Sequence, residues 1–357
     1  MKTLSFGVLS LLFYAGVAVA DEEISLSVIA ENLKQPWGLA QLPDQSWLVT
    51  ERGGRLLHID ATTNATQPVA LKLPDLFVQA QAGLFEVVLA PDFEQSRKVY
   101  LSYACGSASR NTTCVSAGTL DPEMTQLNDL ELIFSGTYKE GAAHYGGRMT
   151  WLPDSTLLLT LGDGFDYREQ AQNLDSYLGK IVRMRGDGSV PEDNPFKHKE
   201  APLTYSYGHR NVQGIVYDAE RDAIWQHEHG PRGGDELNKI EAGKNYGWPL
   251  VTYGIDYTGA YVSPLQKLPG TVQPLLQWTP SLAPAGLALH NGDLWVAHLA
   301  GQRLQRFQFV DGKWQQPKDF LLERETRYRA VASGSDGRLY ILEDSPNAKL
   351  IALTSEK

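Results

Sequence analysis

The hydrophobic residues of this chain fall into short runs, and six of these runs directly follow a small acidic or amide turn. The turns are centred on Asp44, Asp92, Asp154, Asp218, Asn291 and Asp336. Segments such as 47–50 and 157–161 are rich in aromatic, β-branched and leucine residues and are bounded by Gly, Asp, Asn or Pro, a pattern typical of β-strands. Few stretches keep a period of 3.6 residues, so we predict an all-β protein.

The spacing of the six turns predicts how the strands are grouped. Successive turns lie 45 to 73 residues apart, which is too long for a single hairpin and fits a four-stranded unit with a variable loop. The sequence therefore predicts a six-bladed β-propeller with four-stranded antiparallel blades. Because the repeats run nearly end to end without a Pro/Ser-rich linker, we expect one domain over residues 21–357.

The first twenty residues have the layout of a signal peptide. Lys2 precedes an apolar run, and the segment closes on Ala18-Val19-Ala20 before an acidic stretch. A hydrophobic first strand is the alternative. No later segment approaches eighteen uninterrupted apolar residues, so we expect an exported protein, periplasmic or secreted, without a membrane span.

The net charge limits the kinds of binding partner, and the cysteine content bears on the cellular compartment. The formal net charge is −10, and the absence of a Lys/Arg run argues against nucleic acid or an anionic membrane as a partner. Cys105 and Cys114, the two cysteines, could close a small loop in an oxidising compartment. A surface disulfide is favoured over two free thiols.

The densest group of polar residues lies in segment 225–238. His227 and His229 would share a face of a continuing strand, which could form a transition-metal pair, but no third ligand is spaced nearby. The Gly-Pro and Gly-Gly pairs that follow indicate a tight turn offering carbonyl oxygens, the ligand type that calcium prefers. Glu236 and Tyr246 add oxygens. An ordinary glycine-rich loop remains an alternative.

Other charged side chains recur on different predicted blades. They are Arg210 beside Asn211, the pair Arg327 and Arg329, and the pair His144 and Asp163. Each alone has an ordinary structural explanation. Since the loops of a propeller meet at one mouth, together they indicate a site for a flat polyanionic ligand.

These motifs resemble those of the soluble pyrroloquinoline quinone (PQQ)-dependent aldose sugar dehydrogenases, the family of soluble quinoprotein glucose dehydrogenase. The matching stretches cover nearly the whole predicted domain: 35–39, 81–84, 91–93, 144–148, 161–163, 178–181, 208–214, 228–236, 245–249 and 327–329. The GHRN stretch from Gly208 and the EHGPRGGDE stretch from Glu228 are together highly specific.

The resemblance implies three catalytic residues. His144 would be the general base that takes the proton of the C1 hydroxyl as hydride leaves for the quinone. Asp163 would hold the imidazole in the productive tautomer. Arg210 would contact the quinone oxygen that gains negative charge.

The resemblance also implies the cofactor contacts. Asn211 and Gln81 would hydrogen-bond beside Arg210, Arg327 and Arg329 would bind cofactor carboxylates, and Trp278 would stack on the cofactor plane. For the metal, main-chain oxygens of Gly230 and Pro231 would hold the cofactor calcium, and Glu236 with Tyr246 would mark a second, structural calcium.

One departure from the family pattern concerns a lysine that contacts the cofactor. Ala300 occupies its expected position. Either Gln302 or Arg303 substitutes, or cofactor affinity is weaker than in relatives.

We therefore predict a PQQ- and calcium-dependent enzyme that oxidises aldoses to lactones and passes electrons to an external acceptor, as a monomer or homodimer. One alternative is a metal-dependent lactonase on a similar propeller. Another is a non-catalytic propeller that binds a sugar or other ligand.

Overall fold

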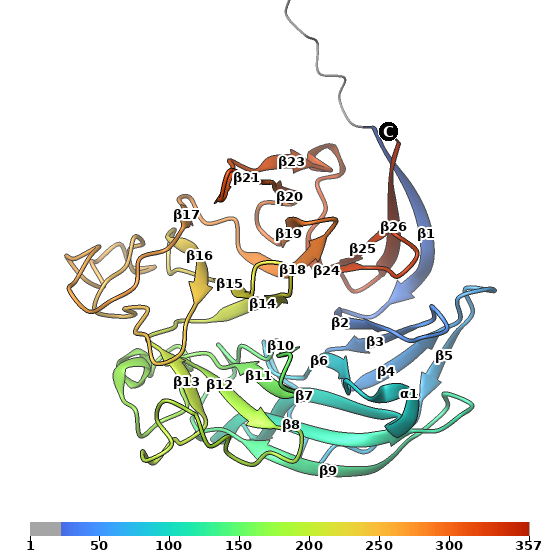
Figure 1. The fold of residues 1–357 in the computed structure, drawn as a ribbon, viewed down its shortest axis with the longest axis horizontal. Coiled ribbons are helices and arrows are strands. Elements are labelled where there is room, and N and C mark those ends of the chain that lie inside the picture. Colours follow the sequence, from blue (N-terminus) through green and yellow to red (C-terminus); the bar gives the residue numbers. More distant parts are fainter. Residues whose placement is uncertain (1–22, 357) are drawn as a thin grey trace, which may run out of the picture.

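The computed structural model describes residues 23–356 as six four-stranded sheets arranged around a central axis (Figure 1). Every strand pair within these sheets is antiparallel. The predicted six-bladed β-propeller is confirmed. The predicted signal peptide, residues 1–20, lies outside the described residues.

One strand of each sheet lies nearest the axis, beside the inner strands of the neighbouring sheets (Figure 1). Strands are counted outward from this inner strand. These inner strands are β2 (Pro36–Gln41), β6 (Leu84–Leu89), β10 (Met149–Trp151), β14 (Val212–Asp218), β18 (Pro284–His290) and β24 (Tyr328–Ser333). The second strands are β3 (Trp47–Glu51), β7 (Lys98–Ser107), β11 (Thr156–Thr160), β15 (Ala223–Glu228), β19 (Asp293–His298) and β25 (Leu339–Glu343). The third strands are β4 (Arg55–Ile59), β8 (Arg110–Leu120), β12 (Lys180–Arg185), β16 (Asp235–Ile240), β20 (Leu304–Phe307) and β26 (Ala348–Glu356). The outer strands are β5 (Thr66–Val69), β9 (Leu127–Ser135), β13 (Thr204–Tyr207), β17 (Leu276–Trp278), β23 (Lys318–Phe320) and β1 (Glu23–Leu33).

Strand β1 closes the ring. It pairs with β26, with Leu26 opposite Leu353, so the sixth sheet combines the N-terminal strand with three C-terminal strands. This pairing hydrogen-bonds both ends of the described chain into one sheet and covers an edge that would otherwise expose unpaired backbone groups.

Few elements lie outside the sheets. They are the helical turn α1 (Phe93–Ser96), the 3-10 helices η1 (Arg168–Gln172) and η2 (Leu322–Arg324), and the hairpin β21 (Phe309–Val310) with β22 (Lys313–Trp314). No helix among residues 23–356 is long and apolar enough to cross a membrane.

The six turns predicted from the sequence occupy equivalent places. Each lies at the connection between the first and second strand of its sheet. Oδ1 of Asp44 accepts the backbone N–H of Ser46, and Oδ1 of Asp154 accepts that of Thr156, each at 3.0 Å. Asp218 and Asp336 make the same bond to the backbone two residues ahead. At these four turns the acidic side chain therefore stabilises the turn.

Hydrophobic side chains fill the space between neighbouring sheets. Leu48 and Leu101, from the first and second sheets, belong to one buried cluster, and Trp295 and Ile341 do the same between the fifth and sixth. Burial between faces explains why second strands such as β11 read as nearly continuous apolar runs.

Cys105 and Cys114 form a disulfide between β7 and β8, with their Cα atoms 5.9 Å apart. The expected bond between these two cysteines is therefore present, but its predicted position at the surface is wrong. Both residues are buried in the hydrophobic cluster between the first two sheets, because β7 and β8 direct them into the core.

Candidate functional site

All six sheets contribute side chains to a cavity of about 390 Å³ near the axis. Its wall includes, in chain order, Trp37, Phe85, Tyr145, Gln213, Leu299 and Arg329. A volume of this size falls in the range of small-molecule sites. The cavity therefore lies where the sequence predicted that loops from separate blades would meet.

His144 and Asp163 form the closest His–carboxylate pair beside this cavity. Nδ1 of His144 lies 2.7 Å from Oδ1 of Asp163, and Oδ2 of Asp163 accepts the indole N–H of Trp248 at 2.8 Å. The backbone N–H of Phe165 also donates to Oδ1. Within the described chain, no residue hydrogen-bonds to Nε2 of His144, so that nitrogen can receive a proton.

The backbone holds the His144 imidazole in place. His144 adopts φ of 51°, a left-handed conformation that side-chain-bearing residues seldom take, and its N–H donates to Oε1 of Gln81 at 2.9 Å. A Cβ on Gly162 would lie 2.1 Å from the carbonyl oxygen of His144, so only glycine fits there. The strand that ends before Asp163 can therefore approach the histidine closely.

Burial, the hydrogen bond within the pair and the charge of Arg210 together set the charge state of His144 and Asp163. Burial lowers the pKa of His144, and the nearby Arg210 guanidinium lowers it further, although the hydrogen bond that the imidazole donates to Asp163 opposes both. Burial opposes ionisation of Asp163, yet its bond to His144 and the charge of Arg210 hold its pKa below the usual value. The histidine is thus neutral and the aspartate ionised at neutral pH, as a histidine base and its orienting carboxylate require.

Arg210 is buried and tied to the glycine-rich loop after β15. Its Nη1 donates to the carbonyl oxygens of His229 at 3.1 Å and Gly230 at 2.7 Å. Its own carbonyl accepts the N–H of Asp163 at 2.8 Å. The structure therefore brings Arg210, Asp163 and Gly230 together, as the sequence predicted.

His144 and Arg210 are not among the residues that line the main cavity, but their chain neighbours are. Tyr145 and Asn211 form part of its wall, together with Gln81. Oδ1 of Asn211 accepts the N–H of Gly146 at 3.2 Å. Arg210 instead lines a second cavity of about 170 Å³ with Trp248, Phe165 and Tyr257.

Arg327 and Arg329 line the main cavity, as expected, and both bind one carboxylate. Nε and Nη2 of Arg327 donate to Oδ2 of Asp344, and the same atoms of Arg329 donate to Oδ1. Burial works against ionisation of Asp344, but the two guanidiniums hold its pKa below the usual range. Asp344 escaped the sequence analysis because it lies fifteen and more residues away, on the far side of a hairpin.

Trp278 does not lie where the sequence prediction needs it. It belongs to the outer strand β17 and is absent from the cavity wall. Its indole donates to Gln305 at 2.9 Å, and its ring contacts Phe307 and His298 between the fourth and fifth sheets. The aromatic residues that do line the cavity are Trp37, Phe85 and Tyr145. Trp37 and Tyr145 lie within the motifs and Phe85 directly follows one, but none of the three was singled out.

Neither suggested replacement for the missing lysine reaches the cavity. Arg303 pairs with Asp319 at 2.6 Å, and Gln302 donates to the carbonyl of Glu325. Ala300 is exposed, whereas Leu299 before it lines the wall.

The predicted ligands of the cofactor calcium lie beside Arg210. The carbonyl oxygen of Gly230 accepts from Arg210, and the N–H of Gly230 donates to Asp235 at 2.9 Å. Pro231 lines the cavity of about 170 Å³. A cation bound here would share the Gly230 oxygen with the guanidinium.

Glu236 and Tyr246 line a narrow space that also borders Glu228. Burial and the neighbouring Glu228 raise the pKa of Glu236 to about 8. Within residues 23–356, the buried amide oxygens of Gln226 and Asn238 have no hydrogen-bond partner, while their amide nitrogens donate to Glu228 and Glu236 respectively. The Tyr246 hydroxyl donates to the Lys239 carbonyl. Across residues 23–356, no group of three or more His, Cys, Asp and Glu side chains is arranged to hold a metal.

The His227 and His229 pair faces the next sheet. Nε2 of His227 lies 3.3 Å from the carbonyl oxygen of Gly286, and Nε2 of His229 lies 2.8 Å from that of Pro284. Both side chains therefore point the same way, as their spacing predicted, but they bond to β18 backbone.

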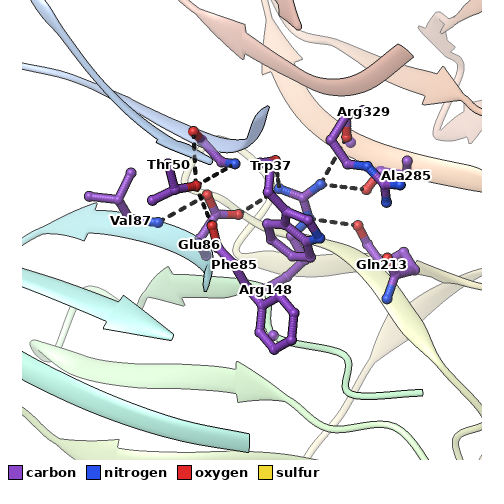
Figure 2. A network of polar contacts seen from close by, with 12 residues as sticks. Trp37, Thr50, Phe85, Glu86, Val87, Arg148, Gln213, Ala285 and Arg329 are labelled. Carbon is purple, nitrogen blue, oxygen red and sulfur yellow. Dashed lines mark hydrogen bonds and ion pairs between the residues drawn. The ribbon is translucent and has the colours of Figure 1, made fainter. Parts of the chain in front are cut away.

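Arg148 is a residue whose importance the sequence did not reveal. It precedes β10, and Figure 2 shows its buried guanidinium at the centre of a polar network. The guanidinium donates to one residue on the inner strand of each of the other five sheets: Trp37, Glu86, Gln213, Ala285 and Arg329. Three of these five line the cavity, so Arg148 helps to hold its wall in place.

Comparison with known proteins identifies the family. The model of the glucose/sorbosone dehydrogenase family matches residues 33–352. The chain is 36% identical over 350 residues to aldose sugar dehydrogenase YliI of Escherichia coli, covering 94% of each sequence.

Solved structures agree with this match. The soluble aldose sugar dehydrogenase of Escherichia coli in its apo form superposes with a TM-score of 0.89 at 35% identity, over 94% of this chain and all of that one. The PQQ-bound aldose sugar dehydrogenase of Streptomyces coelicolor superposes with a TM-score of 0.79 at 29% identity, over 93% and 99%. With its fold, its His–Asp pair and its matching motifs, the chain belongs to the glucose/sorbosone dehydrogenase family.

Proposed function

We propose that this protein is an exported, PQQ- and calcium-dependent dehydrogenase that oxidises the C1 hydroxyl of aldose sugars to the lactone. The observation that carries the proposal is the His144–Asp163 pair, with a free Nε2, beside a cavity lined by guanidiniums. Similarity to the PQQ-bound Streptomyces coelicolor enzyme supports the same cofactor here.

The residues present fit this cofactor. PQQ is a flat acid, and the cavity offers Arg327, Arg329 and the amides of Asn211 and Gln81 as donors. Trp37 supplies an aromatic surface whose ring is backed by the Arg148 guanidinium, centred 3.9 Å away. When bound, the quinone accepts the hydride that leaves C1.

His144 would then act as the general base. Its Nε2 takes the proton of the C1 hydroxyl, and Asp163 stabilises the imidazolium through Nδ1. Trp248 fixes the other oxygen of Asp163, so the carboxylate cannot rotate away from the imidazole. Arg210 would supply a fixed positive charge to the quinone oxygen that gains negative charge.

Calcium would use the carbonyl oxygens of Gly230 and Pro231. Carbonyl oxygens suit this hard cation, and the Gly230 oxygen already lies beside Arg210. We assign Glu236 and the Tyr246 region to a second, structural calcium. Glu228 and Glu236 line one narrow space there, and the pair two positions along the same strands, Gln226 and Asn238, has amide oxygens without a partner in the described chain.

The test is reconstitution of the purified protein with PQQ and calcium. Dye reduction is followed with a panel of aldoses, and the lactone product is identified. Activity that requires both the quinone and an aldose would support the proposal. Lactone hydrolysis without quinone would favour a lactonase, and saturable binding without turnover would favour a binding propeller.

A further inference from the structure

The wall of the main cavity carries more positive than negative side chains. Three guanidiniums and one carboxylate line it: Arg52, Arg327, Arg329 and Asp344. Asp344 is shared by Arg327 and Arg329. Arg52 has no carboxylate partner within residues 23–356, so its charge is not neutralised there.

The only side-chain partner of Arg52 in the described chain is a neutral amide. Nη2 donates to Oε1 of Gln35 at 2.7 Å. A guanidinium carries five N–H donors, so most of its hydrogen-bonding capacity stays available to a ligand.

The backbone fixes Arg52 at the cavity. Its N–H donates to the Gln35 carbonyl, its carbonyl accepts from Leu84, and Gln35 in turn donates to Ser345, all at 3.0 Å. These bonds tie the loop between β3 and β4 to the second and sixth sheets. A Cβ on Gly83 would lie 2.1 Å from the Arg52 carbonyl, so the approach is close.

We infer that Arg52 is an additional carboxylate-binding residue of this cavity, resting on the proposed PQQ-dependent function. Arg327 and Arg329 each use two N–H donors to bind Asp344. Arg52 can instead donate two charge-assisted hydrogen bonds to a carboxylate of the cofactor. A neutral aldose needs no such charge. The fifth blade has Ala300 where relatives have a cofactor-contacting lysine, and its Arg303 is paired with Asp319. In this chain Arg52 supplies the positive charge in place of that lysine.

The experiment compares equilibrium binding of PQQ to purified apo-protein with calcium present, by dialysis and quinone absorbance. Arg52→Gln is expected to weaken binding by about tenfold or more, since a hydrogen-bonded charge contributes roughly 1.5–3 kcal/mol and each 1.4 kcal/mol is tenfold. The matched control is Arg55→Gln, because Arg55 is exposed, pairs with Glu51 and does not line the cavity. Its affinity should stay within about twofold of the unsubstituted protein.

A second variant keeps the arginine and neutralises it. Gln35→Glu would give Arg52 a carboxylate partner, as Asp344 does for its neighbours, and should also weaken PQQ binding. Affinities of Arg52→Gln and Gln35→Glu within about twofold of the unsubstituted protein would overturn this inference. That result would leave the proposed PQQ-dependent function standing. Failure of the unsubstituted protein to bind PQQ saturably would overturn both the role of Arg52 and the proposed function.

Discussion

Arg148 and Glu86 form an ion pair near the propeller axis, with Nη1 2.7 Å from Oε2 and both side chains largely buried (Figure 2). Burial raises the pKa of Glu86 despite the opposing effect of Arg148. The arginine thus provides both the counter-charge and the bonds that join the inner strands.

Replacing Arg148 by methionine should lower the free energy of unfolding strongly. Removing one partner of a buried pair costs about 3–5 kcal/mol, and here several carbonyl groups also lose their donor. Urea denaturation measures the change. Arg338→Met, which breaks an exposed pair with Asp336, should cost less than about 1 kcal/mol, and equal losses would contradict the central role of Arg148.

His144→Ala should reduce aldose oxidation by about a hundredfold or more, the usual contribution of a general base. PQQ affinity should change little, because His144 is not part of the cavity wall. Steady-state kinetics and PQQ binding are measured on the same preparation. Turnover close to that of the unsubstituted protein would remove His144 from the mechanism.

The pH dependence of kcat/KM should report the same histidine. Since burial lowers the pKa of His144, the unsubstituted enzyme should keep its activity below pH ~6.5 and lose it as the imidazole becomes protonated. Asp163 raises that pKa, so Asp163→Asn should move the acid limb to lower pH while reducing the maximum rate. A limb that moves to higher pH would contradict the assignment.

Calcium should stabilise the protein through Glu236. At a concentration about a hundred times its dissociation constant, a ligand that binds only the folded state contributes about 2.7 kcal/mol. Thermal unfolding with EDTA and with calcium measures the gain in Tm. Glu236→Gln should lose part of this gain, and the same gain in both proteins would remove Glu236 from the ligands.

Reduction of the Cys105–Cys114 disulfide should lower stability by roughly 2–3 kcal/mol, because the bond closes a short loop and restricts the unfolded chain. Chemical unfolding with and without reductant measures the loss. The Cys105→Ser/Cys114→Ser double variant is the control, since reductant should not change its stability. An equal effect of reductant on both proteins would assign the loss to another cause.

Much of the candidate site followed from local motifs. His144, Asp163, Arg210 and Gly230 lie in short segments that the sequence predicts to meet, and the fold brings these segments together. Asp344 and Glu86 could not be assigned in this way. An acidic residue in a strand or turn becomes a partner only when another blade places a guanidinium beside it.

Trp278 shows where motif position fails. The sequence places a tryptophan near a loop, but the strand β17 directs its ring between two sheets. A one-residue change of register in a strand reverses the face to which a side chain points, and the sequence alone did not fix that register.

The sequence by itself determined the architecture and the segments that meet near the axis. Turn chemistry and strand periodicity are local properties, so six repeats sufficed to predict six blades. Tertiary structure decided which charges are neutralised. Asp344 is shared by Arg327 and Arg329, Asp319 binds Arg303, and Arg52 has no carboxylate partner within residues 23–356. Such pairing depends on distances between residues far apart in the chain, which only the closed ring of blades sets.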